Sequence, residues 1–374
     1  MRLLDRYLLR ELLAPLGFCL GAFLVLLVSS DLFQDFGHLQ EQRMQTRDIA
    51  LYYLIKTPEY LVEVLPMALL LSLLYTLTQH ARHHEITAIR AAGVSLWRLS
   101  APYFAVGFVA SLAFFAMNEF WVPDSEEAAE RIKHSRTQTG KDPAESFLVR
   151  DHGFVNTRDG RRWQIGVFNL KTAEMRNLRV DWLLPDGSRR WLFAERAIYT
   201  NAAWTFFKVQ EYHDNGLSNA PLVPGFQTNV LVLPEFNETP DEIRSEIKIS
   251  SRLEVRKMRR ADIPILELLD YLRLHRQLNP AAKAWLYTKL HGRFAAPWTC
   301  LIVVLIALPF GAASGRRNLT VGVASSLFIC FSYYVLLQLG LALGTGGFLP
   351  PWLAAWLPNL AFGIVGAWMT FRVR

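Results

Sequence analysis

The sequence predicts an α-helical membrane protein with six transmembrane helices and an inserted all-β, jelly-roll-like domain. Of its 374 residues, 52% are hydrophobic and 20% are charged. This composition is too apolar for an ordinary soluble enzyme and too charged for a membrane bundle alone. Long uncharged blocks alternate with charged segments. Between Asn118 and Arg293 the apolar pattern changes to short runs with a period near two, as strands require.

Uncharged blocks account for the six predicted transmembrane helices. Formal charges are absent from residues 12–30, 64–81, 99–118, 294–315 and 318–371. Each of the first four blocks is long enough to cross about 30 Å of hydrocarbon as a helix. The last block is broken near its middle by the Gly- and Pro-rich segment 344–351, so it predicts two helices joined by a tight turn.

The distribution of basic residues predicts the orientation in the membrane. The short loops of one face hold Arg43, Arg47 and Lys56. The other face, which carries both termini, receives Arg2, Arg6, Arg10, Arg82, Arg90, Arg98, Arg316, Arg317, Arg372 and Arg374. By the positive-inside rule both termini are cytoplasmic, and the long insertion lies outside, on the opposite side of the membrane. The net charge of +7 is thus partly a topology signal and gives no support for nucleic-acid binding.

The chain divides into three predicted parts. Residues 1–118 contain the first three transmembrane helices, residues 119–285 form the periplasmic β domain with connecting helices, and residues 286–374 contain the last three transmembrane helices. Turn-forming residues at 158–160 and 185–187 separate the alternating runs of the insertion. Because no helix there is long enough for a βαβ crossover, a sandwich or jelly-roll layer is favoured over a nucleotide-binding fold.

The sequence lacks the motifs of nucleotide hydrolysis and metal binding. The only Gly-Lys pair, Gly140-Lys141, is followed by Asp142 and is no phosphate-binding loop. The histidines at 80, 83 and 84 lack His-Glu-x-x-His spacing, and a solvated helix explains them better. We therefore expect no catalytic residues, no cofactor and no metal site.

Residues 82–96, between the second and third predicted spans, predict a helix lying along the membrane surface. Ile86, Ile89 and Gly93 share one face of this helix, whereas charged residues can face outward. Such a helix would present Glu85 to a cytosolic partner, although an interfacial hairpin that only links two spans explains the pattern equally well. The candidate contact residues are Arg82, His83, Glu85, Ile86, Ile89, Arg90 and Gly93.

Several segments carry a recognisable family pattern. They are Leu-Asp-Arg-Tyr-Leu-Leu-Arg-Glu at 4–11, Glu-Ile-Thr-Ala-Ile-Arg-Ala-Ala-Gly-Val-Ser at 85–95, and a segment at 291–311 that begins His-Gly-Arg-Phe-Ala-Ala-Pro-Trp and ends Ala-Leu-Pro-Phe-Gly. These segments resemble the LptF/LptG (YjgP/YjgQ) family of lipopolysaccharide-export permeases. Segments 166–170 and 195–204 are similar to that family's periplasmic jelly-roll. The resemblance covers essentially the whole chain.

The resemblance implies the transmembrane part of an ABC-type exporter, which extracts lipopolysaccharide from the inner membrane and passes it to a periplasmic bridge. The implied partners are a second LptF/LptG-type permease, a cytosolic ATPase dimer similar to LptB, and jelly-roll proteins similar to LptC and LptA. The family's coupling helix corresponds to residues 82–96, with Glu85 at the acidic position that contacts the ATPase. Asp31 and Asp35 stand where members carry a lysine for lipid phosphates. Neither the F-type nor the G-type subunit is favoured.

A carrier of a lipid with several acyl chains needs an apolar cavity open to the bilayer and cations at its rim. Each candidate residue has an alternative role: the wall residues as lipid-facing or packing side chains, the basic residues as helix-end anchors. The wall candidates on the first and fifth predicted helices are Leu20, Phe23, Leu27, Phe328, Phe331, Tyr334 and Leu337. The candidates for lipid phosphate are Lys283, Lys289 and Arg293.

Two other classes of function are alternatives to an exporter. A membrane-anchored periplasmic binding or scaffold protein would use its spans only as a tether, and a co-purifying cytosolic ATPase would argue against it. A membrane-embedded enzyme acting on lipids would need catalytic side chains converging at one membrane face. The sequence offers no clear nucleophile and base for such an enzyme.

Overall fold

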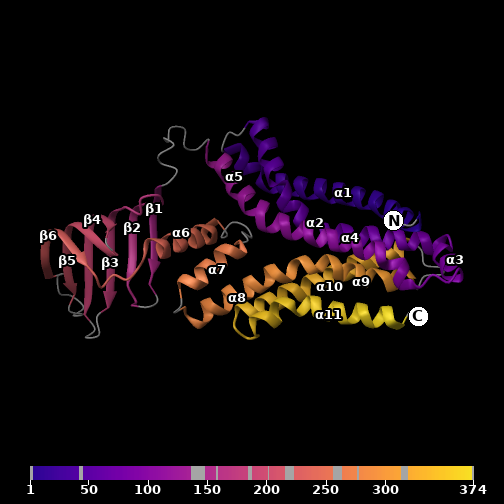
Figure 1. Ribbon diagram of the computed structural model, residues 1–374. Helices are drawn as coiled ribbons and strands as arrows, with labels where there is room; N and C mark the ends of the chain where they lie inside the picture. The colour runs from indigo at the N-terminus through magenta and orange to yellow at the C-terminus, as the bar shows by residue number, and fades with distance from the viewer. Residues whose placement is uncertain are drawn as a thin grey trace. The chain divides into compact units, whose positions relative to one another are not determined.

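The computed structural model shows two compact units. One is formed by Met1–Thr137 with Ala281–Arg374, and the other by Gln138–Pro280. The first is helical and the second contains a β-sheet (Figure 1). The sheet-containing unit lies within the predicted insertion of residues 119–285, and the helix at the start of that insertion, α5 (Val122–Ser135), belongs to the helical unit. The structure describes residues 3–41, 45–135, 148–156, 159–183, 188–200, 202–214, 223–255, 263–275, 278–312 and 319–372.

Among the described residues, six helical stretches are long and apolar enough to cross a membrane, which confirms the predicted helical membrane part. They contain α1 (Leu3–Glu41), α2 (Thr46–Arg82), α4 (Leu96–Ala116), α8 (Pro280–Ala295) with α9 (Thr299–Ala312), α10 (Leu319–Thr345) and α11 (Pro351–Arg372). Several of these helices extend beyond their uncharged blocks. Asp31 and Lys56, at or beyond the ends of those blocks, are therefore parts of helices.

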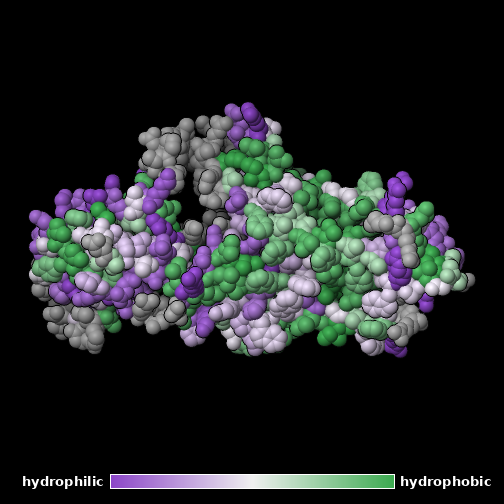
Figure 2. Space-filling view, in the orientation of Figure 1, coloured by the Kyte–Doolittle hydropathy of each residue, from purple (hydrophilic) through white to green (hydrophobic). Residues whose placement is uncertain are grey.

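Helix α2 is central in the bundle, since it packs against α1, α4, α9 and α10. In its most apolar stretch 61% of the residues are buried, compared with 11% in α1 and 17% in α10. Leu69 and Leu73 of α2 share one core with Leu12 of α1 and Val304 of α9. Hydrophobic residues also cover much of the helices' outer surface (Figure 2). Helices α1 and α10 thus leave most of their apolar surface for lipid or another protein.

A short helix, α3 (Glu85–Ala91), connects α2 to α4 at the end of the bundle where the chain termini lie (Figure 1). Turns with positive φ precede and follow it, at His84 (φ 59°) and Gly93 (φ 84°). Only seven residues of the segment predicted as a helix over 82–96 belong to α3. Arg82 instead ends α2, and Gly93 lies in the turn before α4.

The second unit contains a six-stranded antiparallel sheet in which the strands follow one another in chain order, and this confirms the predicted β domain. The described strands form a meander without crossovers. Helix α6 (Pro240–Val255) covers one face through Ile243 and Ile247, and α7 (Ile265–Leu274) packs on α6. The predicted turn at 185–187 lies outside the described residues. The strands are β1 (Leu148–Val155), β2 (Arg162–Asn169), β3 (Met175–Leu183), β4 (Arg189–Thr200), β5 (Ala203–Asp214) and β6 (Val223–Leu233).

The sheet is interrupted along one line that crosses all six strands, which we call the crease. Its residues have no partner in the regular ladder although their neighbours on both sides pair, and three of them, Asp151, Asn177 and Lys208, have φ values near +50°. Across the crease the buried residues are three apart instead of two, as in Ile165 and Phe168. The crease consists of Asp151, Gly166, Asn177, Glu195, Lys208 and Asn229.

Candidate functional site

Glu85, the first residue of α3, is bonded to two transmembrane helices. His80 Nδ1 of α2 lies 2.6 Å from Glu85 Oε2, and the Tyr7 hydroxyl of α1 donates to the same oxygen over 3.1 Å. His80 is buried, and its Nε2 has no hydrogen-bond partner within the described part of the chain. The sequence pattern assigned Glu85 to an outward face, but its side chain is only 32% exposed.

The segment around α3 is held to the bundle at further points. Arg98, near the start of α4, donates to the Asp5 carboxylate of α1 over 2.9 Å. Ile86 is buried in the bundle core, and Ile89 packs against that core. The remaining candidate contact residues, Arg82, His83, Arg90 and Gly93, are all exposed. The structure therefore brings Glu85 and the two isoleucines together on the bundle, with the basic candidates around them.

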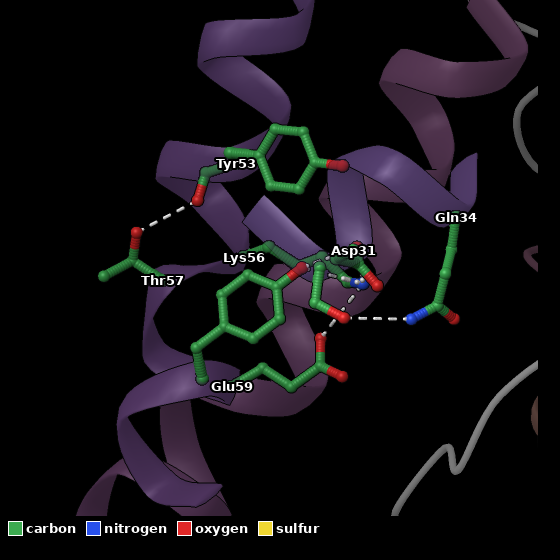
Figure 3. Close-up of polar contacts among 8 residues, drawn as sticks. Asp31, Gln34, Tyr53, Lys56, Thr57 and Glu59 are labelled. Atoms are coloured by element: carbon green, nitrogen blue, oxygen red, sulfur yellow. Dashed lines mark hydrogen bonds and ion pairs between the residues drawn. The ribbon is translucent and has the colours of Figure 1, made fainter. Parts of the chain in front are cut away.

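A second polar cluster joins α1 to α2 far from α3 in the chain (Figure 3). The Tyr60 hydroxyl donates to Asp31 Oδ2 over 2.7 Å, and Lys56 Nζ lies 3.4 Å from the same oxygen. Lys56 Nζ also lies 3.9 Å from Glu59 Oε2. It is 5.6 Å from the ring centroid of Tyr52 and 5.2 Å from that of Tyr60. The Lys56 side chain is 9% exposed. Two acids and two aromatic rings thus hold a lysine that would be costly to bury alone.

We expect Lys56→Met to destabilise the helical unit, because it removes the cation between Asp31 and Glu59. Breaking a buried ion pair costs roughly 3–5 kcal/mol. Thermal unfolding of the purified chain in detergent would measure the loss, with the exposed Arg47→Met on the same helix as the control. The charge swap Asp31→Lys with Lys56→Asp should recover part of the stability. Equal midpoints for Lys56→Met and Arg47→Met would contradict this assignment.

Arg293 is buried, 6% exposed, and lies in the last turn of α8, inside the fourth span. Its Nη1 donates to the Asn118 carbonyl over 2.8 Å and lies 3.4 Å from Glu119 Oε2. Asn118 and Glu119 belong to η1 (Met117–Trp121), a π-helical segment in the third span. A π turn disturbs the regular i→i+4 bonding, so a carbonyl there needs another donor. Arg293 provides this donor, and Glu119 balances its charge.

The helical bundle and the inserted sheet match a known family along nearly all of the chain. A family model described as lipopolysaccharide export system permease LptF/LptG matches residues 6–372. The chain belongs to the LptF/LptG family. It is therefore a transporter subunit for lipopolysaccharide export and a multi-pass inner-membrane protein. A comparison with individual curated proteins finds no match.

For an LptF/LptG protein, the three basic candidates for lipid phosphate differ in their availability. Arg293 is engaged with Asn118 and Glu119, as described above. Lys283 is exposed on α8, with its Nζ 6.0 Å from the Tyr287 ring centroid, and Lys289 is half-buried on the same helix. Lys56, which the sequence placed in a loop, is buried beside Asp31. Of these cations, Lys283 offers the most accessible charge.

The candidate wall residues of the LptF/LptG lipid cavity fall into two groups. Leu20 and Phe23 of α1 pack against the bundle core, and Leu27 packs near Tyr52 and Tyr53. On α10, Leu337 is half-buried, whereas the three aromatic candidates are more open. Phe328, Phe331 and Tyr334 are 72%, 66% and 37% exposed.

The outward apolar face of α1 consists of residues that the sequence reasoning did not select. Their helical spacing places them on one face of α1, but spacing alone does not distinguish this face from the buried one. An uncharged helix offers no polar face by contrast, so its orientation could not be read from composition. These exposed residues are Phe18, Val25, Leu26, Phe33 and Phe36.

Proposed function

We propose that this LptF/LptG protein is the transmembrane subunit of an ATP-driven exporter, in which a separate cytosolic ATPase dimer similar to LptB docks on α3. Both termini and α3 would lie in the cytoplasm, and the sheet would lie in the periplasm. Lipopolysaccharide would leave the bilayer through an apolar cavity and pass to LptC- and LptA-like jelly-roll proteins. The alternative, a membrane-anchored periplasmic binding or scaffold protein whose spans only tether the sheet, requires no link between α3 and the spans.

The geometry of α3 carries this proposal. A helix of seven residues between two turns is too short to be stable without contacts to the bundle. Its first residue, Glu85, is hydrogen-bonded to both α1 and α2. A partner that pushes on α3 would therefore act on two transmembrane helices at once. The sequence has no nucleotide-binding loop of its own, which fits an energy source in another chain.

The outer helices of the bundle support a second permease as the partner within the membrane. Apolar side chains on α1 and α10 are largely left exposed by this chain, and a lipid-binding cavity needs more than one wall. A second LptF/LptG-type chain placed against these helices would enclose such a cavity. Phe331 and Phe33 are examples of side chains that would then contact acyl chains.

Reconstitution tests the proposed function. We expect the chain, co-expressed with its partner genes, to co-purify with a cytosolic ATPase and a second permease. In proteoliposomes the complex should release lipopolysaccharide to added LptC- and LptA-like proteins only when ATP is hydrolysed. A chain that co-purifies without an ATPase, or lipopolysaccharide release that ignores ATP, would contradict the proposal and favour the scaffold.

The proposed orientation has its own test. In intact cells with a permeabilised outer membrane, a membrane-impermeant thiol reagent should label Asp159→Cys in the second unit. The same reagent should label the exposed Ala88→Cys of α3 only after the inner membrane is opened. The wild-type chain, with Cys19, Cys300 and Cys330 in its membrane helices, gives the background. Labelling of both positions from the same side would contradict the topology.

A further inference from the structure

The bonds around Glu85 indicate how a movement of α3 reaches the membrane. We propose that His80 and Tyr7 are positioning residues that fix Glu85 to α2 and α1, so that α3 and these two helices move as one body. This inference rests on the proposed function, since it assumes that the ATPase acts on α3. The inference assigns a role to His80, a buried histidine that is not part of the surface on which the ATPase would dock.

Both bonds of this link use one oxygen of the Glu85 carboxylate. His80 Nδ1 and the Tyr7 hydroxyl meet Oε2, at 2.6 Å and 3.1 Å. Within the described part of the chain, Oε1 makes no hydrogen bond. A carboxylate held through one oxygen keeps a fixed direction for the other, which is then available to a basic side chain of the ATPase. Glu85 would thus join the partner to the bundle through its two oxygens.

The turns on both sides of α3 make such a link necessary. His84 before α3 and Gly93 after it both have positive φ, so the backbone changes direction at each end of the helix. Apart from Glu85, α3 contacts the core through apolar side chains such as Ile86, whose contacts are not directional. A load on α3 could then tilt the short helix about its turns. The Glu85 bonds oppose this tilt and transmit the load to α1 and α2.

The burial of His80 favours a specific role over simple packing. His80 is 4% exposed, and α2 is otherwise rich in buried leucines at this end, including Leu73, Leu74 and Leu77. An imidazole buried there loses hydration that a leucine would not require. Only its Nδ1 recovers a hydrogen bond within the described residues, and this bond goes to Glu85. The rings of Tyr7 and His80 are 5.8 Å apart, so the two side chains also support each other.

Lipopolysaccharide released per ATP hydrolysed by the complete complex in proteoliposomes tests the inference. We expect His80→Leu to lower this ratio roughly tenfold, as the loss of one hydrogen bond to a charged group predicts, while the ATPase still co-purifies. His80→Asn, whose amide nitrogen can occupy the place of Nδ1, should restore most of the ratio. Tyr7→Phe should give a smaller loss than His80→Leu.

The matched control is Tyr75→Phe, which removes a hydroxyl from the same helix as His80 but from a side chain that bonds Gln79 and not Glu85. It should leave the ratio unchanged. If His80→Leu fails to yield a folded complex on size-exclusion chromatography, Tyr7→Phe against Tyr75→Phe decides the question. An unchanged ratio in Tyr7→Phe and His80→Leu, or equal losses in His80→Asn and His80→Leu, would overturn the inference. A wild-type complex without ATP-driven release would instead overturn the proposed function, and the inference with it.

Discussion

Glu85→Lys is expected to abolish ATP-driven lipopolysaccharide release while the chain still inserts into the membrane. The substitution removes the acceptor of the His80 and Tyr7 bonds and reverses the charge that α3 offers to an ATPase. Disrupting a hydrogen-bonded charge contact of this kind costs roughly 2–5 kcal/mol, which corresponds to a loss of about thirtyfold or more. Release per ATP in proteoliposomes and the amount of co-purifying ATPase would measure the effect.

Glu85→Gln is the informative companion of Glu85→Lys. The amide oxygen of Glu85→Gln still accepts hydrogen bonds, but the negative charge is lost. We therefore expect its lipopolysaccharide release per ATP to lie between that of the wild type and that of Glu85→Lys. Both variants should enter the membrane fraction in normal amounts, because Glu85 lies at the start of α3 and not inside a span. Normal export by Glu85→Lys would show that α3 is not the site where the ATPase acts.

Arg293→Met is expected to destabilise the helical unit more than any surface substitution. The variant keeps an unbranched apolar side chain but removes the cation facing Glu119 and the donor to the Asn118 carbonyl. Removing one partner of a buried pair costs roughly 3–5 kcal/mol. The thermal midpoint in detergent should fall clearly below that of Lys283→Met, the control on the exposed side of the same helix.

A second substitution separates a structural role of Arg293 from a role in lipid binding. If Arg293 balances Glu119, then Glu119→Gln added to Arg293→Met should recover part of the lost stability, because no uncompensated charge is left beside η1. If Arg293 instead holds lipid phosphate, Arg293→Met should keep the wild-type midpoint and lose export. That result would return Arg293 to the set of phosphate ligands.

The transmembrane part could be predicted from the sequence because its signal is local. An uncharged block such as 12–30 can be recognised without knowledge of the fold, because the thickness of the hydrocarbon layer sets its minimum length. The ends of the helices could not be predicted in this way. The charge pattern places Asp31 at the end of a span and Lys56 in a loop, but in the structure each lies within a helix and faces the other. A charge that finds its partner on another helix cannot be recognised from its own neighbours in sequence.

The candidate coupling site was predicted in part for a similar reason. The position of a short helix between two spans, with Glu85 and Ile86 in it, followed from spacing and from the family resemblance. The bonds from Tyr7 and His80 did not, since they join residues 78 and 5 positions from Glu85 and depend on how three helices pack. His80 was explained as part of a solvated helix, although it is buried.

The crease has a consequence for how the sheet tolerates changes in strand length. Each half of a strand alternates between buried and open positions on its own, since the spacing of three across the crease resets the alternation. A one-residue insertion within one half would turn the apolar side chains of that half to the wrong face. A one-residue deletion at Asn177 or Lys208, where the alternation already changes, would compensate for such an insertion. Only the residues between the insertion and the crease would then be shifted, and the opposite half of the strand would stay in register.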